Sequence, residues 1–383
     1  MVFADMQEMA DTKVLNDPKY VIGLMSGTSA DSIDAALVKT DGQHLARTDI
    51  TISHPYRPDV AQAIYRARSS PETFLSDTDS ADALSRAIAE DHAEAVRRIA
   101  RMADTAPPQL VGFHGQTIYH NPEAGQTVQL GDGGYLAQLT SLPVIYDFRA
   151  ADMAAGGQGA PLAPIYHQML LMQAGCDMPA VFINIGGVAN LSYCDADGYL
   201  EGYDIGPGNG LIDDLAQYHF SQPFDEGGQL AAQGQVDRKL VTQALSHSFF
   251  SLSGPRSLDR GAFEGLLARP EFTCLSAHDQ IATATAFTSK AIAHAVSALP
   301  NRPRSIIIAG GGAHNNVLMA MLRDRLGGIK IQTADAIGAS SDMVEAELIG
   351  FLAARYIYRL PASFPRTTGV ESPQICGRII YPE

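Results

Sequence analysis

Hydrophobic positions along the chain follow two spacings, one typical of strands and the other of helices. Apolar runs at Tyr20–Leu24 and Ile33–Val38 flank the polar segment Met25-Ser-Gly-Thr-Ser-Ala-Asp-Ser32, which predicts a strand, a turn and a strand. A similar hairpin is predicted at Ala180–Ile185 and Val188–Tyr193, around Gly186-Gly187. Two hairpins of this kind suggest that the chain consists of two related halves.

Other segments alternate between strand and helix signals. Apolar runs bounded by glycine or proline predict strands of a mixed or parallel sheet at 109–113, 127–130 and 143–146, and Tyr199–Tyr203 predicts a further short strand. Apolar residues at steps of three and four predict helices at about 80–102, 210–219, 236–247, 279–299 and 343–358. A further helix is predicted to begin near Asn315. The buried strand predicted at Ser305–Ala309 runs directly into Gly310-Gly-Gly312 and a helix, which is typical of an α/β fold.

Composition narrows the class of protein. The chain has 383 residues, of which 46% are hydrophobic, enough for two globular domains. A net charge of −15 argues against nonspecific binding to nucleic acid or to an anionic membrane. No apolar stretch has the roughly 18 residues of a membrane span, and Met1–Pro18 has no signal-peptide core, so we expect a cytoplasmic protein. The four cysteines form no C-x-x-C pair, so buried free thiols are expected rather than disulfides or a zinc site.

Three glycine turns are candidate ligand sites. The segment 25–32 offers backbone amides, hydroxyls and a carboxylate that suit phosphate oxygens and hydrated magnesium, although an ordinary β-turn has the same composition. Taken alone, Gly186-Gly187 and Gly310–Gly312 could likewise be either ligand-binding turns or ordinary turns. Three such turns at strand ends in one chain favour ligand binding. The chain has no Walker motif, no G-x-G-x-x-G after the first strand and no G-x-S-x-G, which disfavours the corresponding enzyme classes.

Two polar segments are candidates for substrate binding. The glycine-rich stretch that holds Asp147, Arg149 and Asp152 could bind a hydroxylated ligand, or it could be a salt-bridged surface loop. Asp204 precedes a Gly-Pro-Gly turn at a predicted strand end, where a carboxylate could act as a general base on water or a sugar hydroxyl. A turn residue with local hydrogen bonds is the alternative for Asp204. The isolated histidines His114, His120 and His167 lack zinc spacing and are expected to be structural.

From Tyr20 to Pro382, these motifs together resemble those of the anhydro-N-acetylmuramic acid kinases, a family of the actin and hexokinase-like ATPase superfamily. The matching segments are Gly23–Ser29 with Asp31 and Asp34, His114–Thr117, Asp147–Arg149, Asp152–Leu162, Asn184–Gly187 with Asn190, Asp204 with Gly206–Asn209, and Gly310–Gly312 with Asn315. Their number and their order along the chain make chance similarity implausible.

The resemblance implies a two-domain, actin-like α/β fold with duplicated, ribonuclease H-like βββαβα cores and ATP in the cleft between them. The implied division is a flexible arm at 1–18, a first domain at 19–146 plus 359–383, and a second domain at 147–358. The implied ATP-binding residues are Ser26, Gly27, Thr28, Ser29, Ala30, Asp31, Ser32, Ile33, Gly186, Gly187, Asn190, Gly310, Gly311, Gly312 and Asn315. Asp31 is the candidate for binding Mg²⁺, through water.

The resemblance also implies the reaction. Water opens the bridge of 1,6-anhydro-N-acetylmuramic acid, and the released O6 takes the γ-phosphoryl group of ATP, in peptidoglycan recycling. Asp204 matches the family's base, and the implied sugar-binding residues are His114, Gln116, Asp147, Arg149, Asp152, Gln158 and Glu345. The family also leads us to expect a homodimer.

Two departures from the family pattern and two alternatives accompany these expectations. Ser32 stands where the family usually has glycine, which adds a side chain beside the phosphates, and Phe113 stands where serine usually precedes His114.

A related sugar kinase would use Asp204 to deprotonate a free sugar hydroxyl instead of water. An ATP-switched binding protein of the same superfamily would need no sugar loop, so the segment 147–162 argues against it.

Overall fold

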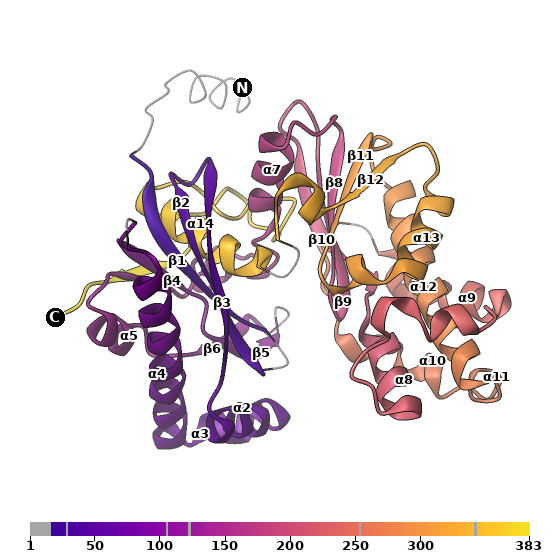
Figure 1. Ribbon diagram of the computed structural model, residues 1–383, viewed down its shortest axis with the longest axis horizontal. Helices are drawn as coiled ribbons and strands as arrows, with labels where there is room; N and C mark the ends of the chain where they lie inside the picture. Colours follow the sequence, from indigo (N-terminus) through magenta and orange to yellow (C-terminus); the bar gives the residue numbers. More distant parts are fainter. Residues whose placement is uncertain (1–16, 28–29, 105, 122–123, 253, 341–342) are drawn as a thin grey trace.

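The computed structural model describes residues 17–27, 30–104, 106–121, 124–252, 254–340 and 343–383. The arm predicted at 1–18 lies outside this part of the chain, except for residues 17 and 18. The described chain forms two lobes, each built around a β-sheet (Figure 1).

The first lobe contains the N-terminal strands. Its strands are β1 (Lys19–Ser26), β2 (Ser32–Thr40), β3 (Leu45–Pro55), β4 (Leu110–Phe113), β7 (Val144–Tyr146) and β13 (Arg378–Ile380), with the separate hairpin β5 (Gln116–Asn121) and β6 (Gln126–Leu130). Its helices are α2 (Pro58–Ser69), α3 (Pro71–Ser76), α4 (Thr78–Met102) and α5 (Gly133–Thr140). The short α6 (Ala150–Ala154) and the helix α7 (Pro164–Gln173) lead into the second lobe.

The second lobe contains the remaining sheet. Its strands are β8 (Ala180–Ile185), β9 (Val188–Cys194), β10 (Leu200–Pro207), β11 (Ser305–Ala309) and β12 (Lys330–Thr333). Its α-helices are α8 (Gly210–Phe220), α9 (Arg238–Ala244), α10 (Glu264–Leu267), α11 (Pro270–Thr273), α12 (Ala277–Ser297) and α13 (Asn316–Arg325). Its 3₁₀ turns are η1 (Glu226–Gly228), η2 (Ala231–Gln233), η3 (Ser248–Ser251), η4 (Arg260–Phe263), η5 (Gly311–His314) and η6 (Ala334–Ile337), and α14 (Val344–Ile357) follows.

The two sheets share one topology. In the described residues the first has the order β13-β7-β4-β1-β2-β3 and the second the order β10-β9-β8-β11-β12. In each, three consecutive strands pair antiparallel, a fourth strand pairs in parallel with the first of the three, and a fifth pairs in parallel with the fourth. The first sheet alone has a further strand, β13, which pairs antiparallel with β7. The helix α4 precedes β4 and α5 precedes β7, just as α12 precedes β11 and α13 precedes β12. This repeat confirms the expected actin-like α/β fold with duplicated βββαβα cores.

Helix α14 packs on one face of the first sheet, against β1, β2 and β4, while α4 covers the opposite face. Glycines in two neighbouring strands allow this close approach. A Cβ at Gly23 would overlap the carbonyl oxygen of Ala346, and a Cβ at Gly112 would lie 2.6 Å from that of Ile349. Helix α14 falls within the range 147–358 that was expected for the second domain, yet it contacts the first sheet.

The second sheet is likewise covered on both faces. Helices α12 and α13 pack on one face, and α7 contacts β8, β9 and β10 while also reaching α14. One apolar cluster therefore runs from the first sheet through α14 and α7 to Phe182 and Ile307 of the second. The helices α8 to α11 form a further cluster with α12, at the outer end of the second lobe (Figure 1).

Several expectations from the periodicity are confirmed, with adjusted boundaries. The predicted hairpins are β1–β2 and β8–β9, and the helix expected at 236–247 contracts to α9. Asp91, which interrupts the apolar stripe of α4, is buried and pairs with the Arg57 guanidinium at 2.6 Å. All four cysteines are free, and Cys194 and Cys376 are buried as expected, but Cys274 is exposed. None of the described helices has both the length and the apolar character needed to cross a membrane.

Candidate active site

A cavity of about 230 Å³ lies where the two sheets face each other across α7 and α14. Five residues predicted from the sequence line it: His114, Arg149, Asn190, Asp204 and Glu345. They come from the end of β4, the loop before α6, β9, β10 and the first turn of α14. Because these elements belong to both lobes, the fold brings together residues that are far apart in the sequence.

Asp204 lies in β10 opposite Asn190 of β9, where a bulge between Asp204 and Gly206 interrupts the pairing. Its Oδ2 accepts a hydrogen bond from the Leu258 amide at 2.7 Å. Its own amide donates to the Arg256 carbonyl at 3.1 Å, and Arg256 Nε donates back to the Asp204 carbonyl at 3.1 Å. The loop before α10 thus holds Asp204 from both its backbone and its side chain.

The environment of Asp204 makes it a stronger base than an ordinary aspartate. Burial raises its pKa to about 6, while the hydrogen bond from Leu258 and the charge of Arg256 act in the opposite direction. The Arg256 guanidinium is itself held 4.2 Å from the ring centre of Tyr203. A carboxylate with this pKa is deprotonated at neutral pH and can still accept a proton during a reaction.

Arg149 and His114, which also line the cavity, form a hydrogen-bonded pair. Arg149 donates to His114 Nε2 from Nη2 at 3.2 Å and from Nε at 3.4 Å, so the imidazole carries its proton on Nδ1, which donates to the Gly115 carbonyl at 3.0 Å. Burial and the charge of Arg149 lower the pKa of His114 to about 3. Burial also lowers the pKa of Arg149, to about 10, against the opposing charge of Glu345. The pair therefore presents one positive charge to the cavity at neutral pH.

Glu345 lines the cavity from the first turn of α14. The surrounding protein raises its pKa by desolvation, the charge of Asp34 raises it further, and Arg149 lowers it. Asp34 lies in β2 opposite Met25, and Met25 also lines the cavity. Two carboxylates and one guanidinium therefore meet beside the first hairpin.

The first hairpin is the predicted phosphate turn. Strands β1 and β2 pair up to Ser26 opposite Ile33. Ala30 has a positive φ of 55° and donates its amide to the Gly27 carbonyl at 3.2 Å. The Ser32 amide donates to Asp31 Oδ1 at 3.0 Å. Thr28 and Ser29, also expected at this turn, lie outside the described residues.

The second hairpin and the third glycine turn lie together at the end of β8. The Asn209 amide donates to the Gly186 carbonyl at 2.7 Å, which fixes the turn at Gly186 and Gly187. Gly310 has a φ of 77°, and a Cβ there would lie 2.5 Å from Asn184 Oδ1. A Cβ at Gly312 would overlap Ile185. These glycines let the turn after β11, which also contains Gly311, pack directly on the second hairpin.

Two other residues that were expected to bind the sugar form hydrogen bonds with other parts of the protein. Asp152 is buried and accepts hydrogen bonds from the Gly159 amide and the Thr368 hydroxyl, both at 2.6 Å. The Gln158 amide donates to the Thr368 carbonyl at 2.8 Å. Asp152 therefore shapes the loop whose residues 159–163 line the cavity.

Three more expected residues have protein partners. Asp147 pairs with Arg378 at 2.6 Å and lines a neighbouring hollow that it shares with His114. Gln116 accepts a hydrogen bond from the Ser26 hydroxyl and donates to the Gly27 carbonyl at 3.2 Å, so it supports the first hairpin. Asn315 Oδ1 caps α13 by accepting from the Leu318 amide at 3.0 Å. Their roles as ligand-binding residues stay predictions.

Two residues of the site were not predicted as such from the sequence. His167 of α7 is buried and hydrogen-bonded, as expected of a structural histidine, with Nδ1 2.7 Å from the Ser192 hydroxyl and its ring stacked on Phe182, and it also lines the cavity. Burial lowers its pKa to about 3, so it is a neutral hydrogen-bonding group. Arg256, which holds Asp204, lies 52 positions further along the chain, in a segment with no sequence signal.

Comparison with known proteins agrees with these motifs. The family model of anhydro-N-acetylmuramic acid kinase matches residues 19–382. An anhydro-N-acetylmuramic acid kinase of Rhodopseudomonas palustris is 46% identical over 367 residues, which cover 94% of this chain and 99% of the relative. The kinase of the same name from Bradyrhizobium diazoefficiens is 43% identical, with the same coverage. A ROK family glucokinase from Streptomyces griseus, solved with glucose and AMPPNP, aligns with 88% of this chain and 99% of its own at 14% identity and a TM-score of 0.38.

Proposed function

The chain belongs to the anhydro-N-acetylmuramic acid kinase family, and we propose that Asp204 is the general base of its reaction. It is a kinase of peptidoglycan recycling that binds ATP and acts on a sugar hydroxyl. The proposed reaction takes 1,6-anhydro-N-acetylmuramic acid, ATP and water to N-acetylmuramic acid 6-phosphate and ADP. The observation that carries the role of Asp204 is its place on the cavity wall with a pKa of about 6.

The proposed chemistry needs one proton acceptor for water. Asp204 takes one proton as the water oxygen bonds to C1 of the sugar, and the bond between C1 and O6 breaks. The O6 atom then bonds to the γ-phosphorus of ATP, and ADP leaves. The other water proton stays on the new C1 hydroxyl, so atoms and charges balance. The contacts of Asp204 with Arg256 and Leu258 support this role, because they orient the carboxylate before the substrate binds.

We propose that Arg149 and Glu345 orient the sugar. The cationic pair of Arg149 with His114 suits the carboxylate of the muramic acid side chain, and Glu345 can accept a hydrogen bond from a sugar hydroxyl. The neutral His167 offers a further polar contact. Gln116, Asp147, Asp152 and Gln158 would then act by shaping the hairpin and the loops around the sugar.

ATP is proposed to lie along the three glycine turns. The first turn, at residues 26–33, and the second, at Gly186, Gly187 and Asn190, would hold the phosphates with backbone amides, and Gly310–Asn315 would face adenosine. The close packing of Gly310 on Asn184 supports this, because it joins the second and third turns into one continuous surface.

The donor chemistry beside the first hairpin fits Mg²⁺. In the described residues no cluster of three or more His, Cys, Asp or Glu side chains could hold a metal ion alone. Mg²⁺ in a kinase needs only one or two carboxylates besides phosphate oxygens and water, and Asp31 and Asp34 supply carboxylates there. Asp31 would hold the ion through water, and Mg²⁺ would neutralise charge on the transferred phosphoryl group.

Some wider expectations also stay proposals. We propose two domains that meet at this cavity, with α14 assigned to the first because it packs on β1, β2 and β4. The homodimer rests on the family resemblance, and the cytoplasmic location rests on the sequence of Met1–Pro18 and the absence of a membrane-length apolar stretch in the sequence. Sedimentation equilibrium of the purified protein would test the dimer.

The decisive experiment uses purified protein, Mg-ATP and water enriched in ¹⁸O. 1,6-Anhydro-N-acetylmuramic acid is compared with N-acetylmuramic acid, and the products are analysed by mass spectrometry. The proposal expects the anhydro sugar to yield N-acetylmuramic acid 6-phosphate with one ¹⁸O at C1. Phosphorylation of the free sugar alone, or ATP turnover without a sugar product, would overturn it.

A further inference from the structure

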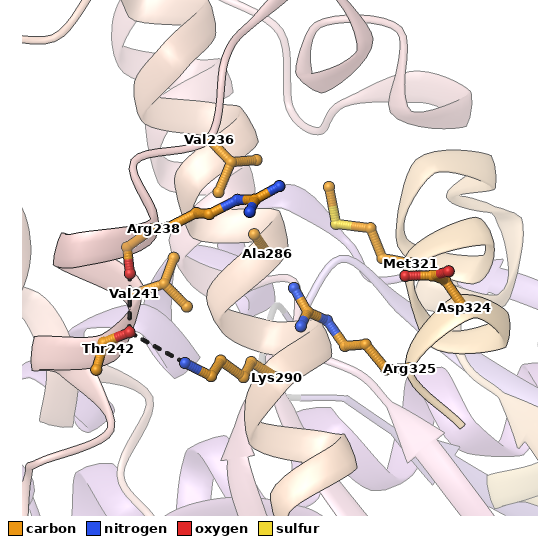
Figure 2. Close-up of a pocket in the computed structure, with 9 residues that line it drawn as sticks. All are labelled: Val236, Arg238, Val241, Thr242, Ala286, Lys290, Met321, Asp324 and Arg325. Carbon is orange, nitrogen blue, oxygen red and sulfur yellow. Dashed lines mark hydrogen bonds between the residues drawn. The ribbon is translucent and has the colours of Figure 1, made fainter. Parts of the chain in front are cut away.

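A second hollow, of about 530 Å³, lies between α9, α12 and α13 in the second lobe (Figure 2). It is larger than the cavity that holds Asp204, and it shares no lining residue with that cavity. Three cationic side chains, one from each helix, border it: Arg238, Lys290 and Arg325. Figure 2 shows the guanidinium groups of Arg238 and Arg325 turned towards the same space.

The lining of this hollow carries more positive than negative charge, with three cationic side chains and one carboxylate. In the described part of the chain, none of the three cations takes part in an ion pair, and Asp324 is the one acidic residue among the lining side chains. The chain as a whole carries a net charge of −15. A local excess of positive charge in so acidic a protein attracts anions to this place and not to the surrounding surface.

Two of the cations are already oriented by neutral hydroxyl groups. Lys290 Nζ donates to Thr242 Oγ1 at 3.1 Å, and that hydroxyl donates to the Arg238 carbonyl at 2.9 Å. Arg325 Nε donates to the hydroxyl of the buried Ser289 at 3.1 Å. These bonds use one donor of each cation and leave its charge in place. The ammonium group and the two guanidinium groups keep further N–H donors for an anion.

The rest of the lining indicates what kind of anion fits. Val236, Val241, Ala286 and Met321 contribute apolar surface beside the cations (Figure 2). The volume exceeds that of a bare phosphate ion. We propose that this hollow binds a small phosphorylated metabolite, with its phosphate on Arg238, Lys290 and Arg325 and its carbon skeleton on the apolar side chains.

The position of the hollow gives this ligand a way to affect ATP binding, a consequence that rests on the proposed function. Helix α13 begins directly after Asn315, so Arg325 lies about 15 Å along the helix from the third glycine turn. The segment that leads into α9 contains Gly228, where a Cβ would overlap Asn315 Oδ1. A ligand that draws α9 and α13 together therefore acts on both sides of the proposed adenosine site. We expect it to change the KM for ATP.

Isothermal titration calorimetry on the whole protein tests the binding directly, with the nucleotide site saturated by ADP. The probes are inorganic phosphate, glucosamine 6-phosphate and AMP, which separate free phosphate, sugar phosphate and nucleotide as sources. For the best probe, Lys290→Ala and Arg325→Ala should each weaken binding about tenfold or more. Arg323→Ala, an exposed residue on the same helix, is the matched control and should leave the affinity unchanged.

If no probe binds, or if the wild type and both variants bind equally, the proposal is wrong. Arg238→Gln, which changes an exposed side chain, replaces either variant that fails to fold. Calorimetry needs no turnover, so its outcome is independent of whether the sugar assay supports the proposed function. Kinase activity of the variants without probe should equal that of the wild type.

Discussion

The carboxylate of Asp204 owes its basicity to burial, which outweighs the two interactions that favour its charged form. The Leu258 amide and the Arg256 guanidinium both stabilise the anion, yet the pKa stays near 6. The same two residues fix the direction of the carboxylate. A base that is pre-oriented and close to neutral in pKa suits removal of a proton from water.

Replacing Asp204 with Asn should separate binding from chemistry. Asn keeps the size of the side chain and can still accept the Leu258 hydrogen bond, but it cannot take a proton. We expect Asp204→Asn to lower kcat roughly 10²–10⁴-fold while sugar and nucleotide still bind. Steady-state kinetics and calorimetry measure the two effects. Asp197→Asn, in the exposed turn between β9 and β10, is the control, and full activity of Asp204→Asn would remove Asp204 from the mechanism.

The pH profile should report the ionisation of Asp204 and its dependence on Arg256. Activity requires the carboxylate form, so kcat/KM should fall as the pH drops through about 6. The charge of Arg256 lowers this pKa, so Arg256→Gln should move the acidic limb to higher pH. Because Arg256 also positions the carboxylate, we expect a lower kcat with little change in the KM for ATP. An acidic limb that does not move would contradict this role for Arg256.

The raised pKa of Asp204 also makes the stability of the protein depend on pH. The folded pKa of about 6 lies above the ordinary value of 3.8, so the folded state binds the proton more tightly than the unfolded state. This contribution is complete below pH 4 and is lost as the pH rises through 6. Asn does not titrate, so the variant lacks this loss. The free energy of unfolding of Asp204→Asn minus that of the wild type should therefore increase by up to about 2 kcal/mol from pH 4 to pH 8. Urea titrations at both pH values measure it, and an equal difference at both would contradict the assignment.

At the scale of elements, the contact of α14 with the first sheet depends on glycine. Gly23→Ala places a Cβ against the Ala346 carbonyl, so either α14 or β1 must move. We expect a loss of about 3 kcal/mol or more in stability, together with a higher KM for the sugar because Glu345 moves with α14. Gly265→Ala, in α10, meets no atom within 4 Å and serves as the control. Chemical denaturation would show equal losses for both variants if the contact were unimportant.

Elements with one clear hydrophobic face could be predicted from the sequence, whereas those between layers could not. The hairpins β1–β2 and β8–β9 stand out because apolar runs flank a glycine turn. Strand β3 was missed because polar residues dominate it and few of its side chains are buried. Helix α7 was missed because it packs between the two sheets and buries residues around most of its circumference, which removes the amphipathic period.

The same limit applies to the site. Motif residues at strand ends, such as Asp204 and Asn190, could be predicted because open α/β sheets place ligand groups there. Asp152 was found as a polar residue of a glycine-rich loop, but no spacing rule shows that its carboxylate faces Gly159 and Thr368. Arg256 could not be found because its contact with Asp204 depends on how a long connection folds back onto β10.

At the scale of the whole molecule, the two lobes are joined by packed elements. Arg47 of β3 binds Glu347 of α14 through two nitrogens at 2.8–3.0 Å, and the Tyr166 hydroxyl of α7 donates to the same carboxylate at 2.5 Å. This buried network and the apolar cluster around it connect the first sheet to α7, which packs on the second sheet. A relative movement of the lobes would therefore turn about α7 and α14, beside the cavity that holds Asp204.

This arrangement predicts closure of the lobes when both substrates bind. Phosphoryl transfer requires that bulk water be kept from the γ-phosphate while one water reaches C1 of the sugar, and closure over the cavity would achieve this. With a non-hydrolysable ATP analogue and the anhydro sugar together, small-angle X-ray scattering should show a smaller radius of gyration than with either alone. Asp204→Asn should close to the same extent, because it retains binding. An unchanged scattering curve with both ligands bound, verified by calorimetry, would contradict closure of the lobes.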